Sequence, residues 1–196
     1  MEKRFLLKNA EFVKVSEAYP HLNACLHYIV DDTHPYIQGY KEAAEILVEH
    51  TLNDKTGLDT LIYPILFLYR QCLELQLKFL IRLGSRLLDS PRRAPTTHDF
   101  KKLWTDCKVI LEKIFNNKDD LRSIKNIGEI ILQLSEADPD AQAFRYPKDT
   151  KGNETLTGIS HINTKAVSDT LGAIILLLDG AETGIIEYIR NRDWAR

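Results

Sequence analysis

The sequence predicts an all-α protein, an up-and-down bundle of four to five long helices. Leu occurs 27 times and Val only 6 times, and Leu favours helices whereas Val favours strands. The 196 residues contain only 9 Gly and 7 Pro, too few for the many tight turns of a β-sandwich or barrel. Apolar residues also recur at the 3.6-residue period of an amphipathic helix over several long segments.

The helical segments follow one another with short connections. The first regular pattern covers residues 36–52 and ends at a turn over 53–57. The next helix, residues 59–88, is apolar on most of its sides, so we expect several neighbours to pack around it, and Pro64 falls near its first turns. Three more helices are expected over residues 97–115, 119–137 and 163–190. Antiparallel packing of consecutive helices is the simplest fold for this order.

Two segments depart from this pattern. Residues 1–33 form an N-terminal extension that we expect to pack on the bundle domain of residues 34–196; a helix over residues 2–18 would end at Tyr19–Pro20. Residues 138–160 form a long polar connection that can hold a short hairpin near Lys151–Gly152. Connections of this length in a compact domain are usually functional or disordered.

Composition excludes several classes of function. The net charge of −2 gives the whole chain no attraction for nucleic acid or membranes, so either role needs a local patch. The longest uncharged apolar runs are shorter than the roughly 18 residues of a membrane span, and the first residues do not resemble a signal peptide. We expect a cytoplasmic protein with no membrane association. Three distant cysteines, Cys25, Cys72 and Cys107, suggest neither a metal site nor disulfides, and no cofactor motif is present.

A row of charges interrupts the apolar central helix. Arg70, Glu74, Lys78 and Arg82 are spaced by four and therefore share one stripe. An exposed stripe of ion pairs would contribute little. Arg70 and Glu74 lie in the most apolar surroundings, where a charge must be paired or serve a site.

The start of the helix after residue 95 offers a second candidate. Thr96 and Asp99 have capping-box spacing. Between them, His98 would lie in the first helical turn, where the helix dipole favours the neutral imidazole that can act as a general base. His98 can equally be a residue of the cap. The surrounding residues 82–102 contain six Lys or Arg against two Asp, which is either an ordinary basic loop or a phosphate-binding patch.

The long connection contains the third candidate, Phe144-Arg145-Tyr146-Pro147. Aromatic and guanidinium groups stack on bases and bind phosphates. Alternatively, Phe144 and Tyr146 plug the end of the bundle while Arg145 pairs with Asp138 or Glu74.

Distance along the central helix limits how these candidates combine. Leu88 is about 21 Å along the axis from Glu74, so His98 reaches Glu74 only if the helix ends early or the loop after Ser90 folds back. We therefore expect Arg70 and Glu74 to line a groove for an anionic ligand together with Arg145–Tyr146. His98 would then lie with Arg92 and Arg93 on a second, basic face.

Three short motifs resemble the HEPN domain superfamily. They are the run Leu73-Glu74-Leu75-Gln76-Leu77-Lys78-Phe79-Leu80, then Thr97-His98-Asp99-Phe100, then Arg145-Tyr146-Pro147, and the resemblance covers residues 36–190. It implies an all-α bundle that usually dimerises. Many members are metal-independent ribonucleases of toxin–antitoxin, phage-defence and CRISPR systems, with an Arg followed after four to six residues by His. Other members bind nucleotides or pair with a nucleotidyltransferase.

The resemblance leads to one main functional expectation and two alternatives. The main expectation is a homodimeric HEPN-like module of a bacterial stress or defence system, without catalysis of its own. It would bind a nucleotide, RNA or a partner protein such as a nucleotidyltransferase or antitoxin, and its ligand-binding residues would be Arg70, Glu74, Lys78, Arg145 and Tyr146. The first alternative is a metal-independent endoribonuclease toxin in which His98 moves protons and Arg93 or Arg145 holds the phosphate. The second is a purely structural interaction bundle.

Overall fold

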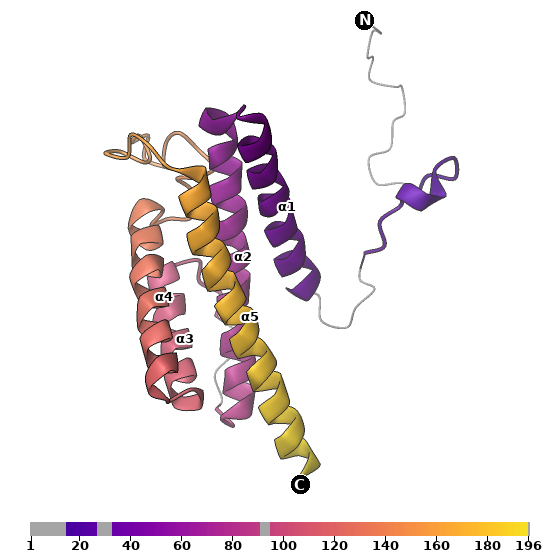
Figure 1. Ribbon diagram of the computed structural model, residues 1–196, viewed down its shortest axis with the longest axis vertical. Helices are drawn as coiled ribbons and strands as arrows, with labels where there is room; N and C mark the ends of the chain where they lie inside the picture. The colour runs from indigo at the N-terminus through magenta and orange to yellow at the C-terminus, as the bar shows by residue number, and fades with distance from the viewer. Residues whose placement is uncertain (1–14, 27–32, 91–94, 196) are drawn as a thin grey trace, which may run out of the picture. The chain divides into compact units, whose positions relative to one another are not determined.

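The computed structural model describes residues 15–26, 33–90 and 95–195 (Figure 1). The chain divides into two units, Met1–Asp32 and Thr33–Arg196. In the first unit the described residues contain one 3-10 turn, Pro20–Leu22. Residues 15–18 are not helical, so the predicted helix over 2–18 is wrong at its end, and residues 2–14 lie outside the described part. Packing of this unit on the bundle stays a prediction.

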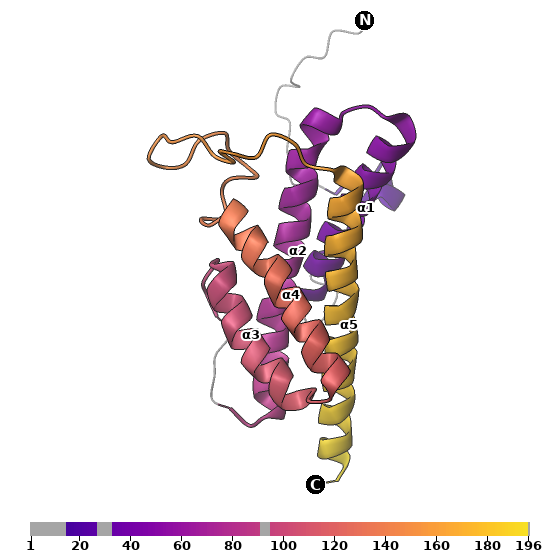
Figure 2. The same cartoon turned by 60° about the vertical axis from the view of Figure 1, so that its left-hand side comes forward.

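The second unit is an all-α bundle, as the sequence predicts. Its five helices are α1 (Thr33–Asp54), α2 (Leu58–Leu87), α3 (Phe100–Ile114), α4 (Lys118–Ala137) and α5 (Thr164–Trp194). The central helix α2 packs against α1, α3 and α5, while α4 packs against α3 (Figures 1 and 2). None of the helices in the described residues is long and apolar enough to cross a membrane.

Helix α2 is central because its apolar side chains point in every direction. Ile65, Leu73 and Leu77 are fully buried, and burial of such side chains is the main force that holds a bundle together. One polar group also joins the helices: the buried Gln76 donates hydrogen bonds to the carbonyl oxygen of Ile175 (3.2 Å) and to Asp179 (2.6 Å) on α5. Lys41 of α1 pairs with the same Asp179 at 3.3 Å. Helices α1, α2 and α5 are therefore connected by one polar network as well as by the core.

The connections fix where the helices begin. Between α1 and α2 the chain turns at Gly57, whose φ of 70° costs little without a Cβ. At the start of α3 the capping residue is Asp99, which accepts a hydrogen bond from the backbone N–H of Lys102 (3.1 Å). The prediction of Thr96 as the cap is therefore wrong, because residues 95–99 are not helical and the helix begins only after Asp99.

The long connection between α4 and α5 extends from one end of the bundle (Figure 2). Its only strand-like pairing in the described chain is an antiparallel bridge between Lys148 and Glu154. The turn inside it is held by Asp149, whose carboxylate accepts hydrogen bonds from the backbone N–H groups of Lys151 and Asn153, both at 2.8 Å. The expected short hairpin near Lys151–Gly152 is therefore present as a turn closed by a single β-bridge.

Gly84 of α2 packs directly against α3. A Cβ built at this position would lie 2.2 Å from Cγ2 of Ile110, whereas a Cβ at Gly172 of α5 would meet no atom within 4 Å. We expect Gly84→Ala to lower the free energy of unfolding by about 1–3 kcal/mol through overpacking. Gly172→Ala should raise it by up to about 1 kcal/mol through helix propensity. Urea unfolding of the two variants measures both values, and equal shifts of the same sign would contradict the proposed helix contact.

Candidate functional site

The two predicted charges of α2, Arg70 and Glu74, are buried and paired. Their side chains are 3% and 1% exposed, and Nη1 of Arg70 donates a hydrogen bond to Oε2 of Glu74 at 2.9 Å. The Arg70 guanidinium also lies over the ring of Phe100, the first residue of α3, at 4.6 Å from the ring centroid. These two residues are not part of a solvated stripe. Arg82 is separate from them and lies over the ring of Phe79.

Arg70 also joins two connecting segments to α2. Its Nε lies 2.6 Å from Oδ2 of Asp138, an ion pair without well-aligned hydrogen-bond geometry. Asp138 ends α4, is buried, and accepts a hydrogen bond from the backbone N–H of Ala143 at 2.7 Å. Nη2 of Arg70 donates to the carbonyl oxygen of His98 at 3.1 Å. One guanidinium thus binds both the segment before α3 and the start of the long connection.

Glu74 holds an exposed imidazole. Nδ1 of His98 lies 2.7 Å from Oε1 of Glu74, and Nζ of Lys78 donates to the same oxygen at 2.8 Å. The His98 side chain is 69% exposed, in contrast to the buried Glu74. A ring presented to solvent is therefore fixed in orientation from beneath by a buried carboxyl group.

Glu74 is ionised in this arrangement. Burial by itself favours the protonated acid, but hydrogen bonds from Lys78 and Arg70 outweigh it and hold the pKa of Glu74 below its usual range. Because an ionised carboxylate only accepts hydrogen bonds, Nδ1 of His98 must carry the hydrogen. Nε2 then faces outward with no hydrogen-bond partner among the described residues. This pair of a carboxylate and an imidazole resembles in its chemistry the orienting pair of many acid–base sites.

The position of His98 corrects a prediction. His98 was expected to reach Glu74 only if the central helix ended early or the loop after Ser90 folded back, and Nδ1 of His98 does lie within 2.7 Å of Oε1 of Glu74. Ten residues separate Leu88 from His98, enough in extended form to cover more than the roughly 21 Å required. The predicted separation of His98 from Glu74 is therefore wrong. The predicted second face, on which His98 lies with Arg92 and Arg93, stays a prediction. Arg92 and Arg93 lie outside the described residues.

Arg145 and Tyr146 lie apart from this cluster. Arg145 donates to the carbonyl oxygen of Ala141 through Nε (3.1 Å) and Nη2 (2.6 Å), and its guanidinium lies over the rings of Phe67 and Tyr146. None of its described contacts is with Arg70 or Glu74. The expected pairing of Arg145 with Asp138 or Glu74 is therefore wrong, because Arg70 occupies both carboxylates.

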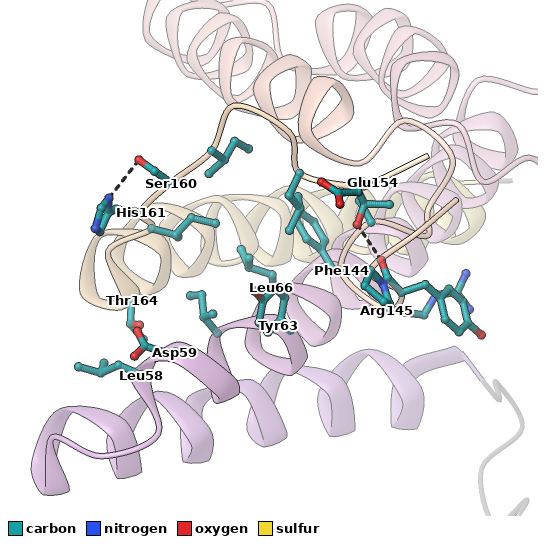
Figure 3. A pocket seen from close by; sticks show the side chains of 18 of the residues that line it. Leu58, Asp59, Tyr63, Leu66, Phe144, Arg145, Glu154, Ser160, His161 and Thr164 are labelled. Atoms are coloured by element: carbon teal, nitrogen blue, oxygen red, sulfur yellow. Dashed lines mark hydrogen bonds between the residues drawn. The ribbon is translucent and has the colours of Figure 1, made fainter. Parts of the chain in front are cut away.

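Arg145 and Tyr146 instead line an open pocket of about 1060 Å³ between the first turns of α2 and the long connection (Figure 3). Phe144 beside them is buried, as expected of a plug, whereas Tyr146 is 53% exposed. The structure therefore assembles two places of interest. We call them the His98 face, formed by His98 and Lys78 over Glu74, and the loop pocket.

No family model, curated protein or solved structure matches this chain. The likeness to HEPN domains therefore rests on the three sequence motifs.

The buried cluster predicts an uneven response to substitution. Arg70→Met leaves the carboxylates of Glu74 and Asp138 buried without their guanidinium, and we expect a loss of about 3–5 kcal/mol. The triple variant Arg70→Met, Glu74→Gln, Asp138→Asn removes the charges together and should lose less. Urea unfolding gives the values, with Lys165→Met as a control that breaks an exposed pair and should change stability by less than about 1 kcal/mol. A triple variant less stable than Arg70→Met would contradict the pairing.

The lowered pKa of Glu74 predicts how stability depends on pH. Its folded-state pKa lies below the unfolded value of about 4.3, so the folded protein binds fewer protons and stability rises with pH in that range. The contribution of Glu74 is complete above about pH 5 and is lost as pH falls through the folded-state pKa. Unfolding free energies between pH 3 and 6 should therefore show a steeper slope for the wild type than for Glu74→Gln. Parallel slopes would show that Glu74 is not stabilised in its charged form.

Proposed function

We propose that this chain is a HEPN-like module that binds a nucleotide or RNA through phosphate groups at the His98 face. The observation that carries the proposal is the exposed imidazole of His98, oriented by the buried Glu74. A ring held in one orientation loses less conformational freedom on binding than a free surface side chain does. Lysine and the protonated imidazole, which carries a hydrogen on Nε2 as well as on Nδ1, are also suitable donors to phosphate oxygens.

The residues around His98 support an anionic ligand. Lys78 is 18% exposed and uses one of its three N–H donors on Glu74. Lys101 and Lys102 are exposed in the first turn of α3, three and four residues after His98. Lys102 pairs at 3.3 Å with Asp99, whose side chain is itself 38% exposed. Such a group of cations attracts a polyanion even on a chain of net charge −2.

Arg70 and Glu74 have a positioning role in this proposal. Both were expected to contact the ligand, but they are almost completely buried and their polar groups are used by Asp138, His98 and Lys78. Their contribution is to hold the segment that carries His98. Substitution at either residue should therefore affect binding through folding, whereas substitution of His98 should affect it directly.

Metal-independent RNA cleavage at the same face is the second candidate. It is favoured by one observation: Nδ1 of His98 is occupied by Glu74, which leaves Nε2 available to take up or release a proton. Cleavage by attack of the 2′-hydroxyl on the adjacent phosphate also needs a group that stabilises the charge on the phosphate. Arg70 is buried, Arg145 lies at the loop pocket and Arg93 is outside the described residues, so Lys78 is the described cation best placed for that role.

One experiment tests both candidates. A fluorescein-labelled single-stranded RNA with mixed sequence is titrated with protein in a buffer containing EDTA, with anisotropy for binding and a denaturing gel for cleavage. We expect binding that weakens as salt rises, and a loss of affinity of about tenfold for His98→Ala. Lys125→Ala, an exposed lysine of α4 in an ion pair with Glu129, serves as the control and should change affinity less than twofold.

The outcomes separate the candidates. Binding with intact RNA supports the binding module, whereas EDTA-resistant cleavage that His98→Ala abolishes supports the ribonuclease. Equal affinities for the wild type, His98→Ala and Lys125→Ala would disprove a phosphate site at the His98 face.

A further inference from the structure

The loop pocket has a construction that the proposed function does not use. Its floor is the exposed side of the first turns of α2 together with Phe144, and its other wall is the long connection up to Thr164 at the start of α5 (Figure 3). The volume of about 1060 Å³ is at the upper end of the range for small-molecule sites. The His98 face shares none of its lining residues.

The long connection stands away from α2 because its polar groups form hydrogen bonds with one another and do not need partners on α2. Thr155 donates to the carbonyl oxygens of Tyr146 through Oγ1 (2.7 Å) and Pro147 through N–H (3.1 Å). The bridge between Lys148 and Glu154 follows directly. At its base, Asp138 binds both Arg70 and the N–H of Ala143. The pocket is therefore formed before any ligand enters, which lowers the entropic cost of binding.

The middle of the pocket is apolar and aromatic, and its two ends differ in charge. Leu66 and Phe144 are buried, and the ring of Tyr63 is 48% exposed between them and the solvent. At one end lies Arg145, with Glu154 close by (Figure 3). Lys148 lines the pocket at the same end, because its backbone is bridged to that of Glu154. Neither Arg145 nor Lys148 has a carboxylate in contact among the described residues. At the other end lie Asp59, in the first turn of α2, and His161.

The separation of the two ends follows from the length of α2 between the residues beside them. The guanidinium of Arg145 lies 5.7 Å from the ring centroid of Phe67, and Phe67 follows Asp59 by eight residues, which is about 12 Å along the axis of α2. A ligand that uses both ends must therefore be elongated. Its negative group would lie at Arg145 and Lys148, and a hydrogen-bond donor at its far end would reach Asp59.

We propose that the loop pocket binds an elongated small molecule with an anionic group at one end, a flat apolar body and an N–H donor at the other end. The anion binds Arg145 and Lys148, the body packs on Tyr63, Leu66 and Phe144, and the donor binds the carboxylate of Asp59. The site is independent of phosphate binding at the His98 face.

Three related compounds test each part of this assignment. Phenylbutyrate has the anion and the flat body, its para-amino derivative adds the N–H donor, and phenylbutylamine replaces the anion with a cation. Ligand-observed NMR on the full chain measures their Kd in the millimolar range expected for ligands of this size. We expect the para-amino derivative to bind at least threefold more tightly than phenylbutyrate, and phenylbutylamine to bind at least tenfold more weakly.

Substitutions at the two ends give the matched controls. Lys148→Gln should weaken phenylbutyrate about fivefold to tenfold, whereas Lys151→Gln, in the same connection but outside the pocket, should not. Asp59→Ala should remove the advantage of the para-amino derivative, whereas Asp119→Ala, in the first turn of α4, should keep it. Circular dichroism verifies that each variant has the wild-type helix content.

Two results would overturn the assignment. The first is the absence of binding for phenylbutyrate and its para-amino derivative up to about 10 mM, well above the range expected for ligands of this size. The second is binding that Lys148→Gln and Asp59→Ala leave unchanged, which would place the compounds elsewhere on the protein.

Discussion

The buried guanidinium of Arg70 fixes the positions of several segments in the described bundle, in addition to the packing of apolar side chains. A charge removed from water must be compensated locally, and Arg70 is compensated by Glu74, by Asp138 and by the carbonyl oxygen of His98. Each of these partners belongs to a different part of the chain. The need to satisfy one side chain on α2 therefore determines where the segment before α3 and the end of α4 must lie. Apolar packing alone specifies such positions less sharply, because side chains of similar size can exchange places in a core.

This arrangement connects the two proposed sites, the His98 face and the loop pocket. Glu74 orients His98, and Asp138 holds the start of the connection that forms the loop pocket through the N–H of Ala143. Both depend on Arg70, although they share no lining residue. Residues with such a role are hard to recognise by their effect on function, because a substitution changes folding and both sites at once. Buried ion pairs of this kind can specify a structure even where they add little to its stability.

The sequence predicted the helices well and the site only in part. Helical periodicity is a local property, so all five helices were predicted to within about four residues at each end. Arg70 and Glu74 were recognisable as charges on an apolar helix. Three features depended on the path of connecting segments and could not be predicted: the contact of His98 with Glu74, the role of Asp138 and the capping of α3 by Asp99. Asp138 carried one signal, an acidic residue at the start of the long connection, but nothing local identified Arg70 rather than Arg145 as its partner.

The charges of the cluster are compatible with the role proposed for His98. Arg70 and Lys78 balance Glu74 and Asp138, so the buried part is neutral when the imidazole is neutral. The imidazole therefore does not have to carry a charge in order to neutralise the interior. A histidine that was itself needed to neutralise Glu74 would be restricted to its charged form. Because Lys78 and Arg70 already fulfil that need, Glu74 is left to orient the ring, and the chemistry of His98 remains available at the surface.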